Sequence, residues 1–227
     1  MRTSKLVAVL AVAALGTGAA GAVELRGRVI LEGESGALAQ VQGVLVYYLP
    51  DGGGRQPPIP VPEEPFRIVT VRKEFTPRSL VVPVGATVRF PNQDNILHNV
   101  FSLSGSNRFD LGLYRRGEGK EVTFDAAGVV RVFCNVHHSM VAYVVVVETP
   151  FYTMAAVDGG FALDGLPAGP GKLMVWQEQA EPREVAVQLP RPGSLEVRLE
   201  LDKPRVPQHQ NKFGKPYSRR RGGRDYG

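Results

Sequence analysis

The chain has 227 residues, of which 43% are hydrophobic and 22% are charged, and its formal net charge at pH 7 is +5. No apolar run approaches the roughly 20 residues of a membrane span, so we expect a soluble chain of one or two domains. Residues 203–227 hold eight Lys or Arg against one Asp and residues 1–22 hold two more, which leaves the part between them at −4. The excess of positive charge therefore lies mainly in the C-terminal tail, and the folded part of the chain is acidic.

The first 22 residues have the pattern of an export signal. Arg2 and Lys5 precede an apolar stretch from Leu6 to Leu15, and the small residues Ala20-Gly21-Ala22 form an A-x-A cleavage site. We expect cleavage before Val23 and a periplasmic or secreted location. An uncleaved anchor is the alternative, although the many small residues would make a weak span. An exported chain is not expected to bind nucleic acid.

The rest of the chain is a series of strand-like runs separated by turns, without heptads, long helical periods or repeats. Residues 50–65, with six prolines and three consecutive glycines, interrupt the series as a linker or exposed loop. Alternating or β-branched runs occur at 25–31, 44–49, 66–71, 80–84, 87–90, 121–124, 130–134 and 144–147, and again beyond residue 150. The sequence therefore predicts an all-β protein.

One eight-residue stretch, Phe133 to Met140, holds the only cysteine of the chain, two of its four histidines and a methionine. Cys134 follows Val130 and Val132 at a period of two, which turns its side chain toward the core. An exported chain with one cysteine has no internal disulfide, so the thiol stays free, pairs with another chain or binds a metal. His98, at the end of another apolar segment, could complete a metal site.

The candidate ligands are thus His98, Cys134, His137 and Met140. Two imidazoles, a thiolate and a weak thioether suit a copper ion that cycles between Cu(I) and Cu(II), because soft sulfur favours the reduced ion. A methionine ligand argues against zinc, and a dinuclear copper centre would need two cysteines. The alternative, an inert buried cysteine with turn histidines, does not explain why four ligand types occur together. We therefore predict one type 1 copper ion.

The ligand segments belong to a longer set of motifs. The set includes Phe75-Thr76-Pro77, Val84-Gly85, Val88-Arg89-Phe90, Asn92, His98-Asn99-Val100, Phe109 to Tyr114 and Cys134-x2-His137-x2-Met140. From about Phe66 to Glu148 the chain resembles the plastocyanin/amicyanin family of cupredoxins, and its short ligand loop is closest to amicyanin-like proteins associated with methylamine utilisation. The resemblance implies a Greek-key β-sandwich in which His98, Cys134 and His137 are equatorial ligands and Met140 is axial. It also implies that Asn99 steadies the thiolate and ties the ligand loops.

One position departs from this family. Amicyanin-like sequences usually have proline after the second ligand histidine, where this chain has His138. Ligation through His138 instead of His137 is an alternative, but its one-residue gap to Met140 would crowd the loop. We expect His138 to lie beside the exposed ligand edge and to make electron transfer pH-sensitive, so that His138→Pro would remove the pH dependence of the redox potential.

The flanking segments resemble a second family. Gly27-Arg28-Val29, Gly43 to Val46, Asp158 to Phe161 and Gly165-Leu166-Pro167 are similar to the carboxypeptidase-regulatory-like, transthyretin-like β-sandwich, which has a carbohydrate-binding-like fold. The two resemblances together imply a cupredoxin inserted into that sandwich. We predict a signal peptide at 1–22, the two parts of the sandwich at 23–49 and 149–202, a linker at 50–65, the cupredoxin at 66–148 and a disordered basic tail at 203–227. Trp176 is expected in the core, with a sugar platform as the alternative.

The expected function is that of an exported copper protein that carries single electrons between redox partner proteins and has no catalytic turnover. No second metal site, carboxylate pair or nucleophile–base set accompanies the ligands. A copper carrier or storage protein, and a cell-surface carbohydrate-binding or adhesion module with an accessory copper site, remain as alternatives. The basic tail is expected to be solvated because it has almost no aliphatic residues, with docking to an acidic partner or membrane surface as the alternative.

Overall fold

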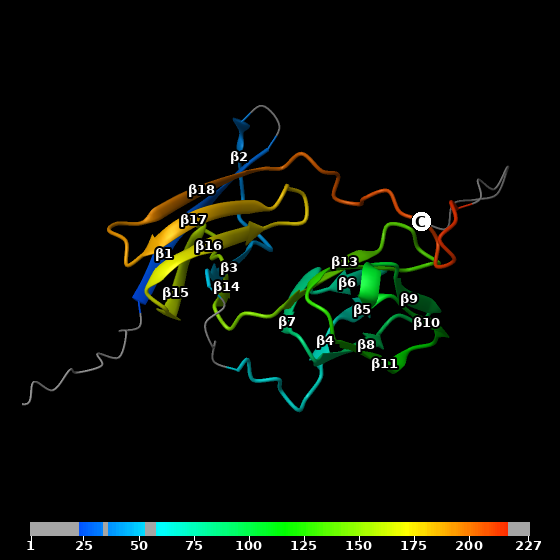
Figure 1. Cartoon of the computed structure of the whole chain (residues 1–227). Coiled ribbons are helices and arrows are strands. Elements are labelled where there is room, and N and C mark those ends of the chain that lie inside the picture. The colour runs from blue at the N-terminus through cyan, green and yellow to red at the C-terminus, as the bar shows by residue number, and fades with distance from the viewer. Residues whose placement is uncertain (1–22, 34–35, 53–57, 218–227) are drawn as a thin grey trace, which may run out of the picture.

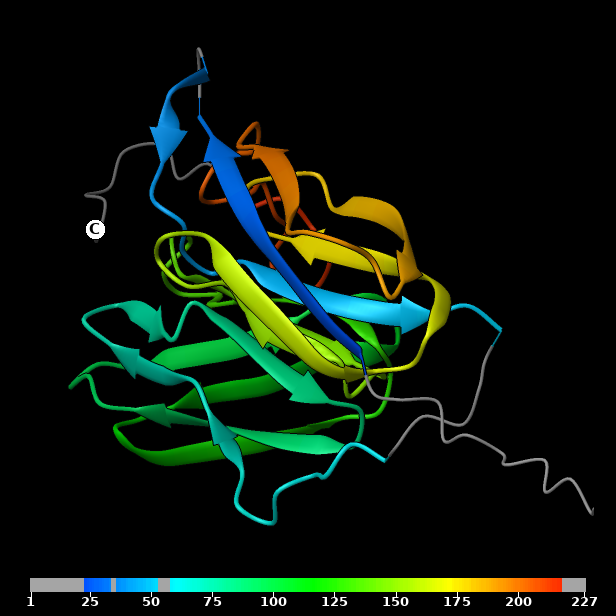
Figure 2. The same ribbon diagram turned by 90° about the vertical axis from the view of Figure 1, so that its left-hand side faces the viewer.

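The computed structural model describes residues 23–33, 36–52 and 58–217, and the regular structure in these ranges is β-strand apart from short 3-10 turns. Figure 1 shows two packed β-sandwiches, and Figure 2 shows the same two after a turn of 90°. The predicted all-β architecture is confirmed. The predicted signal peptide lies outside the described residues. No helix in the described part of the chain is long and apolar enough to cross a membrane.

The first sandwich is built from two separate parts of the chain. One sheet has the order β15-β1-β18 with β2 paired to β1, and the other has the order β14-β3-β16-β17. β1 is antiparallel to β15 and parallel to β18, and β3 is antiparallel to β14 and β16. The bounds are β1 Val23–Glu32, β2 Leu38–Ala39, β3 Leu45–Pro50, β14 Tyr152–Met154, β15 Gly160–Leu166, β16 Gly169–Trp176, β17 Arg183–Leu189 and β18 Leu195–Glu200. Both sheets therefore combine strands from before residue 51 with strands from after residue 151.

The core of the first sandwich follows from alternation along its strands. In β1 the side chains of Leu25, Val29 and Leu31 are buried and those between them are more exposed, as a half-buried strand requires. They meet Leu166 of the neighbouring strand β15 and Leu173 of β16 in the facing sheet, all in one apolar cluster. Burial of these apolar side chains stabilises the association of the two parts of the chain. The free energy gained is about 25 cal/mol for each Å² of apolar surface removed from water.

The second sandwich holds the candidate ligands. One sheet has the order β10-β9-β12-β13-β7, and the other has the order β11-β8-β5-β6 with β4 paired to β8. The bounds are β4 Phe66–Arg67, β5 Val69–Val71, β6 Glu74–Thr76, β7 Ser79–Pro83, β8 Ala86–Asn92, β9 His98–Ser102, β10 Phe109–Tyr114, β11 Gly117–Phe124, β12 Gly128–Phe133 and β13 Val141–Val147, with a 3-10 turn at Gly105–Asn107. The expected strand over 66–71 is divided into β4 and β5, which both pair in parallel with β8.

Strand β13 is buried on both faces because it lies between the two sandwiches. Ala142, Val144 and Val146 face the core of the second sandwich. Tyr143 and Val145 face the other way, into a cluster with Leu45 and Trp176 of the first sandwich. Trp176 is only 7% exposed and meets Tyr143 edge-on, with 5.6 Å between ring centroids. Trp176 is therefore an interface residue, as expected for a core tryptophan, and is not an open sugar platform.

An ion pair joins the sandwiches at the edge of this apolar cluster. The Arg78 side chain, before β7, donates from Nε to Glu178 Oε1 at 2.6 Å and to Glu178 Oε2 at 2.8 Å. The Glu178 side chain is only 9% exposed. A carboxylate so nearly buried needs its partner, because breaking such a pair leaves an uncompensated charge.

Candidate metal centre

The candidate ligands lie at one end of the second sandwich, where two strands and one loop meet. His98 is the first residue of β9, Cys134 directly follows β12, and His137 and Met140 lie in the loop before β13. Two backbone hydrogen bonds shape this loop: Met140 N donates to His137 O at 3.1 Å and Cys134 N donates to Met140 O at 3.4 Å. The predicted strand phase is confirmed, since Val130, Val132 and Cys134 are all buried in the same core.

Three ligand atoms converge. Cys134 Sγ lies 3.7 Å from His98 Nδ1 and 3.9 Å from His137 Nδ1, and the three atoms are all within 4.8 Å of one another. Metal–nitrogen and metal–sulfur bonds of about 2.1 and 2.3 Å at 120° would separate the two atoms by about 3.8 Å, against about 3.6 Å at a tetrahedral angle. The observed spacing is short enough for one metal ion to be bound by all three protein ligands.

Burial separates the candidate ligands into two kinds. His98 and Cys134 are fully buried, and Met140 is 1% exposed in the same core cluster. His137 is half-buried and is the candidate ligand that reaches solvent. Its ring lies beside that of His98, with 4.8 Å between centroids. The site is therefore closed on the protein side and open only along the His137 edge.

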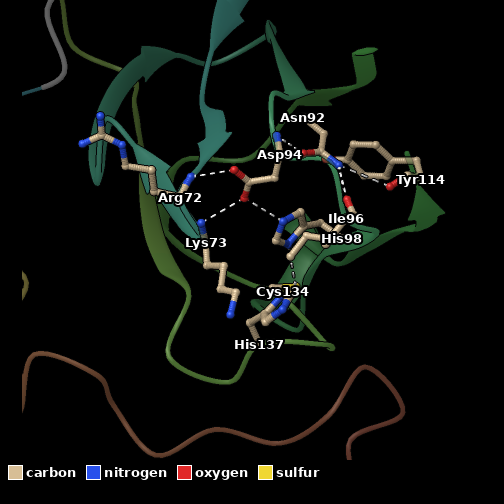
Figure 3. A network of polar contacts seen from close by, with 9 residues as sticks. All are labelled: Arg72, Lys73, Asn92, Asp94, Ile96, His98, Tyr114, Cys134 and His137. Carbon is tan, nitrogen blue, oxygen red and sulfur yellow. Dashed lines mark hydrogen bonds and ion pairs between the residues drawn. The ribbon is translucent and has the colours of Figure 1, made fainter. Parts of the chain in front are cut away.

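Asp94 holds the His98 ring, and Figure 3 shows the contact between its carboxylate and that ring. Asp94 Oδ2 lies 2.9 Å from His98 Nε2, so an Nε2–H donor leaves Nδ1 unprotonated and free to bind a metal. The carboxylate also accepts the backbone amides of Arg72 at 2.7 Å and Lys73 at 2.9 Å. Both residues have positive φ, 55° and 58°, and this tight turn between β5 and β6 aims their amides at Asp94.

The charge states of these groups favour metal binding. Burial works to raise the pKa of Asp94, but the amides of Lys73 and Arg72 and the His98 ring outweigh it, so the pKa lies below its usual value. Burial lowers the pKa of His98 despite the neighbouring Asp94 carboxylate. Burial, with the charges of His98 and Lys73, also lowers the pKa of His137. Both imidazoles are therefore neutral near pH 7, as ligands must be.

A polar loop carries Asp94 into place. Asn92 Oδ1 accepts the Asp94 amide at 2.9 Å, while Asn92 Nδ2 donates to the carbonyls of Ile96 at 2.9 Å and Tyr114 at 3.5 Å. Asp94 was not among the residues predicted from the sequence. The available signal was a carboxylate four residues before a ligand histidine, within the polar run that ends β8.

Asn99 makes a different contact from the one expected. Its side chain is buried, and Nδ2 donates to Asp110 Oδ1 on β10 at 2.6 Å. Asp110 Oδ1 also accepts the Gly112 amide at 2.9 Å. Asn99 therefore ties the His98 segment to β10, and the expected support of the thiolate stays a prediction.

His138 is exposed and lies outside the three-atom cluster. Its ring stacks on Tyr217 with 3.6 Å between centroids, and its carbonyl accepts a hydrogen bond from His209 Nε2 at 2.9 Å. Burial and the charge of His209 lower the pKa of His138. The imidazole that approaches Cys134 is that of His137, as the expected ligand set requires.

The described part of the C-terminal tail makes contacts that its composition did not suggest. We expected disorder from residue 203 onward, but residues 203–217 run from the first sandwich to the ligand loop (Figure 1). The expectation rested on the lack of aliphatic side chains in this segment. The rings of His209 and Tyr217 supply contacts instead, because they pack on the loop. The arginine cluster Arg219 to Arg224 lies outside the described residues, so the prediction for that part is untouched.

One family model matches the part of the chain that carries the candidate ligands. Residues 70–148 match the model of copper binding proteins of the plastocyanin/azurin family. A purple cupredoxin from Nitrosopumilus maritimus is 26% identical over 36% of this chain and 99% of its own, with a TM-score of 0.33. A reduced variant of amicyanin is also 26% identical, over 38% of this chain and 86% of its own, with a TM-score of 0.35.

A further solved structure is the copper-containing nitrite reductase from Thermus scotoductus SA-01, 26% identical over 44% of this chain and 25% of its own, with a TM-score of 0.36. No curated protein matches the chain. The family match at residues 70–148 and the convergent His98, Cys134 and His137 support a cupredoxin domain in this part of the chain, with copper as the cofactor in a site typical of type 1 centres.

Proposed function

We propose that this chain is an exported electron carrier, in which His98, Cys134, His137 and Met140 hold one copper ion that passes single electrons between redox partner proteins. The observation that carries the proposal is the convergence of Cys134 Sγ with two histidine Nδ1 atoms at 3.7 and 3.9 Å in a domain of a copper-binding family. When bound, the copper supplies a one-electron Cu(I)/Cu(II) couple.

The surrounding residues favour electron transfer over chemistry on a substrate. The three buried ligand candidates arise from a packed sandwich core, which holds them in place and keeps water away. Asp94 holds the His98 ring through the bond to Nε2, so that ring does not turn when the charge at the site changes. A ligand set made up of four protein side chains leaves no open position for a substrate.

An apolar surface around the His137 edge supports docking of a redox partner. Ile96 and Leu97 precede His98, Val136 precedes His137, and Leu113 pairs with Asn99 on the neighbouring strand. These four side chains are 42%, 44%, 45% and 59% exposed, in that order. Large apolar side chains gathered on a surface are typical of protein interaction sites. A partner seated there would approach the copper through His137.

We propose the domain organisation as predicted, with the copper domain inserted into a second β-sandwich. The pairing of β1 with β15 and β18, and of β3 with β16, supports a discontinuous first sandwich. Export rests on residues 1–22 alone.

Voltammetry of the purified protein tests electron carriage. We expect a reversible one-electron couple that persists over repeated cycles with the copper retained in both oxidation states. Loss of the copper ion when the protein is reduced would contradict a function in electron transfer. It would favour the alternative, a protein that carries copper itself. Leu113→Ser, which changes the apolar surface without touching a ligand, should leave the couple unchanged and serves as a control for the site.

A further inference from the structure

Residues 205–217, here called the C-terminal strap, are fastened to the rest of the molecule at both ends. At the start, the Arg205 carbonyl accepts a hydrogen bond from the Arg78 guanidinium, which also binds Glu178. Near the end, the strap forms hydrogen bonds with Asn135 and His138, the residues that directly follow Cys134 and His137. These contacts join a segment that follows the first sandwich to the copper site of the second.

Lys212 contacts the Cys134 segment directly and is linked to the His98 segment through Asp110. Its backbone amide donates to Asn135 Oδ1 at 3.1 Å, next to Cys134. Its Nζ donates to Asp110 Oδ2 at 2.7 Å, and the other oxygen of that carboxylate holds Asn99, next to His98. The Lys212 side chain is 23% exposed, so its ion pair is partly protected from solvent. One strap residue therefore links the His98 side of the site to the Cys134 side.

The charge state of Asp110 fits this role. Burial works to raise the pKa of Asp110, but the hydrogen bonds from Lys212, Gly112 and Asn99 together outweigh it and hold the pKa below its usual value. The carboxylate therefore stays ionised and accepts all three donors at neutral pH. Such charge-assisted hydrogen bonds are stronger than neutral ones.

A tight turn presents Lys212 in a fixed orientation. Gly214 N donates to Asn211 O and Asn211 N donates to Lys215 O, both at 2.8 Å. The Asn211 side chain accepts the amides of Phe213 at 2.9 Å and Lys215 at 3.2 Å. The turn is closed by its own hydrogen bonds, so Lys212 is held in place without help from a neighbouring molecule.

Two strap rings cover the outer side of the ligand loop. His209 stacks on Phe133 at 4.0 Å between centroids with an interplanar angle of 12°, and it donates to the His138 carbonyl. Tyr217 stacks on His138, and burial together with the charge of Cys134 raises the pKa of Tyr217 to about 12. The strap thus contacts Phe133, Asn135 and His138, the neighbours of Cys134 and His137.

We propose that the C-terminal strap forms part of the support of the copper site and that Lys212 is a positioning residue for the ligands Cys134 and His98. This inference rests on the proposed copper function. Groups that hold metal ligands from behind change metal affinity on the order of 10- to 100-fold when they are lost. The strap would therefore reduce copper loss and set the geometry of the thiolate ligand, although it contributes no ligand itself.

The test compares Lys212→Met with Lys215→Met in the full chain. Both variants remove one positive charge from the same turn, but Lys215 is exposed and its contacts within the turn are made by its backbone. We expect Lys212→Met to speed copper transfer to a Cu(I) chelator by about tenfold and to shift the thiolate-to-copper absorption band. Lys215→Met should match the wild type, and Lys212→Arg should restore most of the wild-type behaviour.

Amide hydrogen exchange of the metal-free chain gives a second, copper-independent measurement. Exchange at residues 134–140 should be faster in Lys212→Met than in Lys215→Met, because loss of the ion pair to Asp110 loosens the strap and with it the backbone contact to Asn135, beside Cys134. Two results would overturn the inference about Lys212 without affecting the proposed function. One is equal exchange in Lys212→Met and Lys215→Met; the other is faster exchange in Lys212→Met with an unchanged thiolate-to-copper band and an unchanged rate of copper release. A wild-type chain that shows no thiolate-to-copper band would instead overturn the proposed function, and the inference with it.

Discussion

At the scale of single residues, the copper site depends on which nitrogen of each ligand histidine carries a proton. Asp94 accepts from His98 Nε2, so His98 Nδ1 faces Cys134 as a lone-pair donor. The backbone amides of Arg72 and Lys73 hold Asp94 in turn. The orientation of a buried ligand therefore depends on a turn more than twenty residues earlier in the chain.

Replacing Asp94 tests this arrangement. Asp94→Asn keeps the size of the side chain but removes the charge that favours the Nε2–H form of His98, so copper affinity should fall on the order of 10- to 100-fold. Competition with a copper chelator measures the change. Asp125→Asn is the matched control, since Asp125 is exposed and makes no hydrogen bond or ion pair within the described residues. Equal affinities of the two variants would show that Asp94 does not orient the ligand.

The three histidines at this end of the second sandwich also predict how the metal-free chain responds to acid. The pKa values of His98, His137 and His138 are all lowered from the ordinary 6.5, in each case chiefly by burial. The unfolded chain therefore binds more protons than the folded one below about pH 6.5. Stability should be full above that pH and should decrease as the pH falls toward the lower folded-state pKa values.

Urea unfolding of the metal-free protein at about pH 7.5 and about pH 5.5 checks this sign. The midpoint should be lower at the acidic pH. The pKa of Asp94 is lowered from 3.8, so the loss of its contribution belongs to a more acidic range and does not confuse the comparison. A midpoint that stays constant or rises on acidification would contradict the assignment of neutral, buried imidazoles.

Sequence reasoning was strongest for residues whose chemistry is rare. One cysteine, a Cys-x2-His-x2-Met spacing and an inward strand phase were enough to select Cys134 and His137, and the structure brings both to His98. Asp94 and the contact between Asn99 and Asp110 were not predicted. Each depends on a hydrogen bond between segments whose approach only the folded sheet determines, and carboxylates are too common for their type to indicate such a role.

At the scale of secondary-structure elements, the period-two patterns predicted where the strands lie. They did not predict which other elements pack against each face of a strand. The period of two places Phe133 on the face of β12 opposite Val132 and Cys134, and its side chain is nonetheless only 4% exposed. Phe101 and the His209 ring of the strap cover it. Strand phase determines which face a side chain occupies, whereas burial of that face depends on what else packs there.

The strap shows the limit of composition as a guide to order. Residues 203–217 have few aliphatic side chains, and that suggested a solvated tail. Ring stacking, one ion pair and a self-closed turn at Asn211 give the segment its contacts instead. These depend on partners distant in the sequence, and so a local count of apolar residues could not reveal them.

At the scale of the whole molecule, the two sandwiches share a buried apolar interface. The division of the chain was predicted from two separate resemblances, and the parallel pairing of β1 with β18 across about 170 residues is the contact that a discontinuous domain needs. The packing of β13 against Leu45 and Trp176 was not predicted. A strand buried on both faces has the same apolar run whichever element covers it.

Trp176→Ala tests the importance of this interface. Loss of a large aromatic side chain that is 7% exposed should lower the free energy of unfolding by about 3–5 kcal/mol. Denaturant unfolding measures it, with Leu38→Ala, at a side chain 76% exposed, as a control expected within about 0.5 kcal/mol of the wild type. A loss below about 1 kcal/mol would mean that the sandwiches do not depend on this contact for stability.

The central claim is that Cys134 binds copper as a thiolate beside two histidines. Addition of Cu(II) to the metal-free protein and to Cys134→Ser tests it most directly, by visible absorption. We expect an intense blue thiolate-to-copper band in the wild type and none in Cys134→Ser. A colourless wild-type protein that binds zinc tightly and gives no such band with copper would contradict the account.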